Sequence, residues 1–138
     1  MQSHDDRAAR LEPQTLAFLQ DLDAVGGLPL FALSPAAARR ALVQLQQQAH
    51  VAIPPANVST HIMDGGPTGT VRIHIVCPPG SAPPSGRLLP GIMYFHGGGW
   101  MLGDVETYDR LLRELVNATQ STIVFVDYDR APEARFPV

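Results

Sequence analysis

A strand–helix–strand pattern near the end of the sequence constrains the fold more than any other feature. Residues 91–97 begin as a continuous apolar run, residues 107–119 carry apolar side chains at helical spacing, and residues 121–129 contain a second apolar run. Uninterrupted apolar runs are typical of parallel strands buried on both faces, and a helix is the usual crossover between such strands. The sequence therefore predicts a parallel βαβ unit and an α/β protein.

Three consecutive glycines, residues 97–99, follow the first of these strands and come directly after His96. Ligands of open α/β sheets bind beyond the carboxyl ends of the strands, where this turn is expected. Two phosphate-binding patterns do not fit, because Asp104 and Val105 stand where a phosphate loop needs Lys and Ser/Thr, and Leu102 replaces a glycine of the dinucleotide fingerprint. We therefore interpret the turn as an oxyanion hole, in which backbone N–H groups stabilise the negative oxygen of acyl transfer.

The first 50 residues are predicted to be helical. Leucines recur at helical spacing after Pro13, and a second helix is expected to begin at Ser34, a good N-cap, with Pro35 in its first turn. Both helices are expected to pack on a core through an apolar face. These faces consist of Leu16, Leu19 and Leu22 in the first helix and of Ala38, Ala41, Leu42 and Leu45 in the second.

An antiparallel pair of strands is predicted between these helices and the βαβ unit. Residues 57–66 and 69–80 alternate in polarity, and residues 64–69 have the composition of a turn. His61 and His74 could lie on neighbouring strands, but no third ligand accompanies them, and we interpret them as surface-facing positions rather than a metal site. The Pro/Gly/Ser-rich stretch that follows is expected to be an exposed loop.

Composition excludes several classes of function. The 138 residues are 45% hydrophobic and 17% charged, with a net charge of −3, which gives no reason to expect a nucleic acid or an anionic membrane as partner. Cys77 is the single cysteine, so neither an internal disulfide nor a cysteine-based metal site can form. No signal peptide is recognised, and no apolar run approaches the ~20 residues that span a bilayer. We expect a cytoplasmic protein with no cofactor and no metal.

Two ordered motifs carry a resemblance to a known family. The sequence HGGGW at the end of the first parallel strand, Gly103, Asp109 and then DYDRAPEARFP resemble the hormone-sensitive-lipase-like branch of the α/β-hydrolases, which are carboxylesterases and lipases. The resemblance is strong over residues 91–137 and weaker before them. It implies an α/β-hydrolase sheet, with residues 1–50 as a helical cap segment and residues 51–138 as the first half of the core.

The resemblance also implies roles for the residues of both motifs. Gly98 and Gly99 would supply oxyanion-hole amides, Gly97 would shape the turn, His96 would support the loop, and Trp100 would line the acyl or alcohol pocket. The second motif would be held in place by Asp127, Tyr128, Pro132, Glu133 and Pro137. Asp129 and Arg130 are assigned no role. The substrate of the complete protein would be a small carboxylic ester.

The sequence departs from the family because the nucleophile motif Gly-x-Ser-x-Gly is absent. None of its serines, which are Ser3, Ser34, Ser59, Ser81, Ser85 and Ser121, has the flanking glycines. In the family, the Ser, the acid and the His all follow the second motif. We therefore expect the N-terminal part of a serine esterase, inactive by itself. Alternatives are a non-catalytic ester-binding module and an interaction module whose open sheet edge pairs with a complementary C-terminal half or a second copy.

Overall fold

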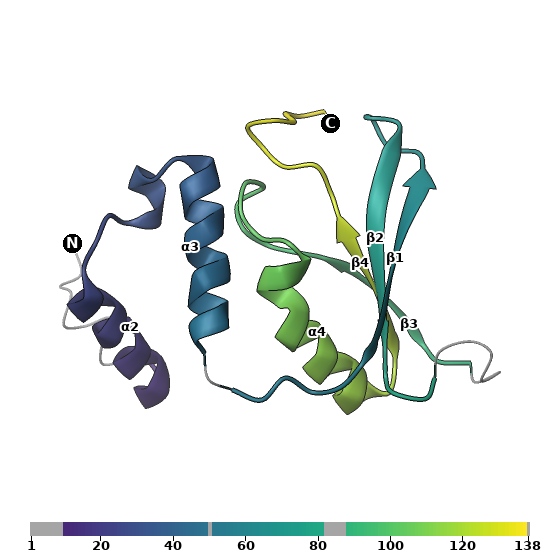
Figure 1. Ribbon diagram of the computed structural model, residues 1–138, viewed down its shortest axis with the longest axis horizontal. Coiled ribbons are helices and arrows are strands. Elements are labelled where there is room, and N and C mark those ends of the chain that lie inside the picture. The colour runs from purple at the N-terminus through teal and green to yellow at the C-terminus, as the bar shows by residue number, and fades with distance from the viewer. Residues whose placement is uncertain (1–9, 50, 82–87, 138) are drawn as a thin grey trace. The chain divides into compact units, whose positions relative to one another are not determined.

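The computed structural model describes residues 10–49, 51–81 and 88–137 (Figure 1). Contacts divide the chain into two compact units, one ending at Ala32 and the other beginning at Leu33. The sheet and both motifs belong to the second unit. The predicted boundary between a cap and a core near residue 50 stays a prediction.

The first unit contains helix α2, Pro13–Val25, and the three-residue 3-10 helix η1, Leu30–Ala32. The Glu12 carboxylate caps α2 by accepting a hydrogen bond from the Thr15 amide at 3.0 Å. None of the helix residues is buried. Leu16 is half-buried and Leu19 and Leu22 are exposed, so the described residues of this unit form no core around these leucines, and their packing on a core stays a prediction.

Helix α3, Pro35–Gln48, begins where the sequence predicts. The Ser34 hydroxyl accepts a hydrogen bond from the Ala37 amide at 3.3 Å, and Pro35 occupies the first turn, where its missing N–H costs nothing. Ala38 is fully buried, and the other three residues of the predicted face are half-buried. The apolar face of this helix is confirmed.

The second unit contains a mixed four-stranded sheet of order β1-β2-β4-β3. Strands β1, Asn57–Asp64, and β2, Thr70–Cys77, form the predicted antiparallel hairpin. Strands β3, Gly91–Phe95, and β4, Thr122–Asp127, are parallel and are connected by helix α4, Val105–Thr119. The structure thus confirms an α/β fold in which an antiparallel pair precedes a parallel βαβ unit.

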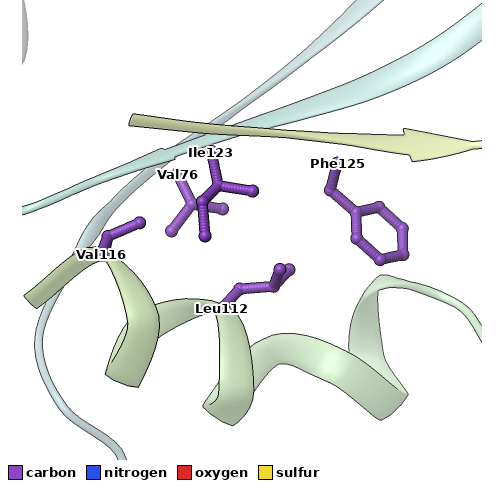
Figure 2. Packing of buried hydrophobic residues seen from close by; sticks show 5 residues of the cluster. All are labelled: Val76, Leu112, Val116, Ile123 and Phe125. Carbon is purple, nitrogen blue, oxygen red and sulfur yellow. The ribbon is translucent and has the colours of Figure 1, made fainter. Parts of the chain in front are cut away.

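The hydrophobic core lies between α4 and one face of the sheet (Figure 2). Five side chains form its centre, and none is more than 1% exposed: Val76, Leu112, Val116, Ile123 and Phe125. Residues 123 and 125 of β4 face the helix because side chains alternate along a strand. This packing fixes where β4 ends, and therefore where the second motif begins.

The histidine prediction needs a correction. His74 is buried, with 7% of its surface exposed, because β2 lies between β1 and β4 and Phe125 packs beside the ring. Its Nδ1 is 2.9 Å from the Thr60 hydroxyl oxygen, whereas His61 pairs with Ile73 and therefore lies on the other face of the sheet. No group of three metal-ligating side chains occurs among the described residues.

None of the helices in the described ranges is both long and apolar enough to cross a bilayer. The cytoplasmic location stays a prediction.

Candidate active site

Both sequence motifs lie at one edge of the sheet. Strands β3 and β4 are parallel and in register from Gly91, opposite Thr122, to Phe95, opposite Val126. Their carboxyl ends therefore lie next to each other, and residues 96–103 after β3 meet residues 128–134 after β4. This edge is where open α/β sheets place their ligands.

The glycine turn has a backbone that requires glycine at specific positions. Gly98 has φ of 122°, and a Cβ added there would lie 2.1 Å from the carbonyl oxygen of Leu102. That oxygen is close because the Leu102 amide donates to the Gly98 carbonyl at 2.9 Å. Gly99 and Trp100 both have φ of 61°, which glycine adopts at little cost and Trp rarely adopts. The turn is therefore tightly closed on itself.

Gly103 is constrained by close packing as well. A Cβ at this position would lie 2.8 Å from the Gly97 carbonyl oxygen and 2.7 Å from Nδ1 of His96. Gly97 has more room, since the nearest atom to an added Cβ is the Tyr108 hydroxyl at 3.4 Å. Gly103 therefore lets the chain return past the start of the turn and enter α4.

The amides of Gly98 and Gly99 are directed to no acceptor within the described ranges, and both residues are exposed. The amides of Met101 and Leu102, by contrast, both donate to the Gly98 carbonyl oxygen. Exposed, unpaired N–H groups on a constrained turn can donate hydrogen bonds to an anionic oxygen.

His96 is buried beneath the turn, with 4% of its surface exposed. Its Nδ1 lies 2.8 Å from the Gly97 carbonyl oxygen, so the ring donates to the start of the turn in the Nδ1–H tautomer. The ring stacks on Tyr128 at 4.2 Å between centroids and on Phe125 at 5.2 Å. Nε2 has no hydrogen-bond partner in the described part of the chain. These contacts immobilise the ring below the glycines.

Tyr128 connects the second motif to the first. Its hydroxyl donates to the His96 carbonyl oxygen at 2.5 Å. Burial raises the pKa of Tyr128 above the usual 10.0, which keeps the hydroxyl protonated and able to donate at neutral pH. A second link runs from the Ala131 amide to the Trp100 carbonyl oxygen at 2.9 Å. Each end of the glycine turn is thus hydrogen-bonded to the segment that follows β4.

Comparison with known proteins agrees with this arrangement. Residues 92–138 match a family model for the α/β-hydrolase fold. A thermostable esterase from Pseudomonas putida is 36% identical, with a TM-score of 0.82 over 92% of this chain. The chain belongs to the α/β-hydrolase fold.

Two further solved structures extend the comparison. An ester hydrolase from the metagenome of Lake Arreo is 32% identical, with a TM-score of 0.78 over 93% of this chain, and an esterase of the fungus Rhizomucor miehei is 27% identical, with a TM-score of 0.77 over 92%. This chain spans 38% of the bacterial and fungal proteins and 41% of the metagenomic one. The match thus covers the N-terminal part of the fold.

A cavity adjoins the glycine turn of this hydrolase fold. It has a volume of about 360 Å³ and lies between α3 and α4, and its lining includes Leu42, Gly97, Gly98, Gly103 and Tyr108. Trp100, predicted from the resemblance to line a substrate pocket, does not line this cavity, and its side chain is 73% exposed. A larger, mainly polar cavity of about 540 Å³ is lined by residues of the β1–β2 hairpin and by side chains that hydrogen-bond to residues 96–103, among them Arg39, Tyr128 and Arg130.

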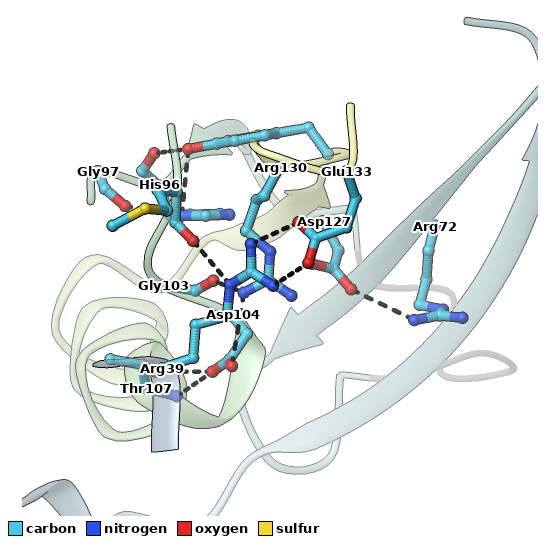
Figure 3. A network of polar contacts seen from close by, with 12 residues as sticks. Arg39, Arg72, His96, Gly97, Gly103, Asp104, Thr107, Asp127, Arg130 and Glu133 are labelled. Atoms are coloured by element: carbon cyan, nitrogen blue, oxygen red, sulfur yellow. Dashed lines mark hydrogen bonds and ion pairs between the residues drawn. The ribbon is translucent and has the colours of Figure 1, made fainter. Parts of the chain in front are cut away.

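Sequence reasoning missed the contacts of Asp129 and Arg130. Arg130 donates to the Gly103 carbonyl oxygen and lies 3.7 Å from the Asp104 carboxylate, which in turn caps α4 (Figure 3). Asp129 accepts a hydrogen bond from Thr68 in the β1–β2 turn at 2.6 Å. Both side chains hold neighbouring segments against the motif. The cap at Asp104 could have been recognised from Thr107, three residues later, but the long-range contacts left no local signal.

Proposed function

We propose that this chain is the N-terminal part of a serine carboxylesterase and that its glycine turn supplies part of the oxyanion hole. The observation that carries this function is the pair of exposed, unpaired amides of Gly98 and Gly99 beyond the carboxyl end of β3. The solved relatives named above are esterases or ester hydrolases, which supports a carboxylic ester as substrate.

The remaining residues of the turn would keep these amides in place. His96 would support the loop from below, Gly97 would shape its start, and Trp100 would line the acyl or alcohol pocket. Attack on an ester carbonyl forms a tetrahedral intermediate, whose oxygen would accept hydrogen bonds from Gly98 and Gly99. Such donors stabilise the transition state because the fold has already oriented them.

The nucleophile would come from outside these 138 residues. The sequence contains no Gly-x-Ser-x-Gly, and the chain by itself would therefore be inactive. The rest of the hydrolase would contact β3, which has a strand neighbour on one side only among the described strands. It would supply the Ser, the acid and the His, either as a continuation of this chain or as a complementary C-terminal half.

Hydrolysis of short p-nitrophenyl esters tests this function. The 138-residue chain should show no turnover above background, whereas a completed hydrolase, meaning this chain extended through a nucleophile motif and its acid and His, should show saturable turnover. Gly98→Ala in the completed hydrolase should abolish most of that turnover. Saturable hydrolysis by the short chain that disappears in its Gly98→Ala variant would show that the chain contains a nucleophile of its own.

A second candidate function is an interaction module derived from the same fold. The open edge of β3 favours it, because an apolar edge strand readily pairs with another chain. Ester binding and ester turnover by the completed hydrolase distinguish the two candidate functions. A folded, completed protein that binds an ester analogue without turning over esters would favour the non-catalytic alternative.

A further inference from the structure

Arg39 of α3 makes several long-range hydrogen bonds to the segments that contain the two motifs (Figure 3). Its Nε donates to the Met101 carbonyl oxygen at 2.8 Å, and one terminal nitrogen donates to the Ala131 carbonyl oxygen at 2.7 Å. Both terminal nitrogens also donate to the Glu133 carboxylate, at 2.9 and 2.8 Å. A single guanidinium therefore joins a helix, the glycine turn and the segment after β4.

The glycine turn needs such external contacts. Gly98, Gly99 and Trp100 are exposed and have positive φ, and the side-chain packing of this part of the turn consists mainly of the Trp100 ring beside Tyr128, at 5.5 Å between centroids. Its own closure rests on two bonds to the Gly98 carbonyl oxygen, from Met101 at 3.2 Å and from Leu102 at 2.9 Å. A glycine turn without support has many other conformations available.

Arg39 contacts the turn at Met101, just after the glycines. Met101 directly follows Trp100, whose carbonyl oxygen already accepts from the Ala131 amide. Arg39 binds the carbonyl oxygens of both Met101 and Ala131, so it closes a ring of contacts around these two segments. Movement of the turn relative to the segment after β4 would break bonds on both sides of the guanidinium.

We propose that Arg39 is a positioning residue, which fixes the direction of the Gly98 and Gly99 amides by tying Met101 to Ala131 and Glu133. Its catalytic consequence rests on the function proposed above, whereas its effect on the turn does not. Arginine suits this task because its planar fork of five N–H donors can bind three acceptors at once, which a lysine ammonium does not match in geometry.

The charge state of the pair supports this role. Hydrogen bonds from Arg39 are the largest cause that lowers the pKa of Glu133, from 4.5 to about 2. Its bond to Glu133 likewise raises the pKa of Arg39. Both groups are therefore charged throughout the neutral range. The Arg39 side chain is 18% exposed, and its bonds to the Met101 and Ala131 carbonyl oxygens are partly protected from water.

Hydrogen exchange on the 138-residue chain, at a concentration below that of the self-association expected for it, tests the positioning role without using activity. Arg39→Met removes every donor of the fork, and Arg40→Met is the matched control, because Arg40 is the next residue of α3, is exposed and has no partner in the described ranges. The amides of Met101, Leu102 and Ala131 should exchange about tenfold faster in Arg39→Met, while those of β4 should not change. The control should match the unmodified chain.

Trp100 gives a second readout, because it is the single tryptophan and lies in the turn. Its fluorescence anisotropy should fall in Arg39→Met and not in Arg40→Met. If Arg39→Met does not fold, the same measurements on Glu133→Gln test the positioning role. This variant removes the negative charge that Arg39 binds and keeps the side-chain volume. Unchanged exchange at the turn, or an increase spread equally over α4 and β4, would overturn the positioning role.

The completed hydrolase adds a kinetic readout. Arg39→Met should lower kcat about tenfold with KM nearly unchanged, because misdirected amides weaken transition-state binding more than substrate binding. An active completed hydrolase with unchanged kcat in Arg39→Met would overturn the catalytic consequence. Faster exchange at the turn in a completed protein that hydrolyses no ester would support positioning and contradict the proposed function alone.

Discussion

The two parallel strands have similar sequences and very different surroundings. Strand β4 is paired on both sides, and its Ile123 and Phe125 are fully buried against α4. Strand β3 is paired with β4 alone, and its Met93 and Phe95 are 59% and 65% exposed. Met93 and Phe95 lie beside Val124 and Val126, on the face of the sheet away from the α4 core.

The difference shows that β3 has the composition of an interior strand in the position of an edge strand. Edge strands of soluble proteins usually carry charges, prolines or bulges that prevent pairing with another chain. β3, with the sequence GIMYF, has no charge and no proline. We infer that its free edge and the exposed face around Phe95 are covered in the completed hydrolase.

Truncation of matched phenylalanines is expected to give the largest effect. Phe125→Ala should destabilise the fold by about 3–5 kcal/mol, because it removes a fully buried ring from the core. Phe95→Ala should change the free energy of unfolding by less than about 0.5 kcal/mol, because that ring is mostly in water. Urea unfolding measures both, at a protein concentration low enough for the chain to be monomeric. Equal losses would show that the face around Phe95 is covered in the 138-residue chain.

Much of the fold could be predicted from the sequence, because its signals are local. The apolar runs of β3 and β4, the turn composition between β1 and β2 and the cap at Ser34 each act within a few residues. The burial of His74 was not predictable in this way. It depends on β2 lying between β1 and β4, and strand order is a long-range property.

In the candidate site too, the local features could be predicted and the long-range contacts could not. The glycine turn could be located from its motif, and its geometry fits a need for glycine at Gly98 and Gly103. The contacts that hold the turn could not be predicted, because they join distant segments. Arg39 reaches Glu133 across 94 positions of the sequence, and Asp129 reaches Thr68 across 61. Arg39 lies outside the apolar face that helical spacing predicts for its helix, and no neighbouring residue in the sequence indicates its distant partners.

Substitution in the loop after β3 is expected to affect catalysis more than folding. In the completed hydrolase, Gly99→Val should lower kcat about a hundredfold, equivalent to ~3 kcal/mol, by misplacing an oxyanion donor. An added Cβ at Gly99 meets no atom within 4 Å, so the expected loss of folding stability is only the ~1–2 kcal/mol of an unfavourable backbone conformation. Steady-state kinetics and thermal unfolding of the same samples compare the two effects.

Gly98→Ala is the contrasting substitution at this turn. Its Cβ would lie 2.1 Å from the Leu102 carbonyl oxygen, so it should disturb the turn itself and reduce both kcat and stability. Unchanged kcat/KM in a folded Gly99→Val variant would remove Gly99 from the oxyanion hole, whatever the result for Gly98.

Self-association should reveal the free edge of β3 directly. We expect the 138-residue chain to form oligomers or aggregates at tens of micromolar, because exposed apolar surface costs roughly 25 cal/mol per Å² and an unpaired edge accepts another strand. Phe95→Lys should weaken association by about tenfold, since a charge on the exposed face opposes burial. Sedimentation velocity measures both chains. A monomeric unmodified chain with a sharp, cooperative unfolding transition would contradict this expectation and favour a self-sufficient domain.

The smallest expected effect concerns the ion pair that ties the loops after β3 and β4. Glu133 has a pKa of about 2 in the folded chain and 4.5 as its ordinary value, chiefly because Arg39 donates hydrogen bonds to it. A lowered folded pKa means that the stabilisation is complete above about pH 4.5 and disappears as the pH falls from 4.5 towards 2. The carboxylate side chain is 64% exposed, so solvent and salt screen the pair and the effect is small.

The free energy of unfolding, measured as a function of pH, distinguishes the contribution of the Arg39–Glu133 pair from general acid denaturation. The unmodified chain should be slightly more stable than Glu133→Gln at pH 6, and the difference should shrink between pH 4.5 and 2 and in 1 M salt. In an Arg39→Met background, Glu133→Gln should produce a much smaller pH-dependent difference, because the largest cause of the lowered carboxyl pKa is gone and only the backbone hydrogen bond of Glu133 and the charge of Arg130 remain to lower it. A difference that persists in full at pH 2, or that is undiminished in the Arg39→Met background, would show that Glu133 stabilises the loop chiefly by another contact. The loops after β3 and β4 would then be joined by Tyr128 and Ala131 without the help of this ion pair.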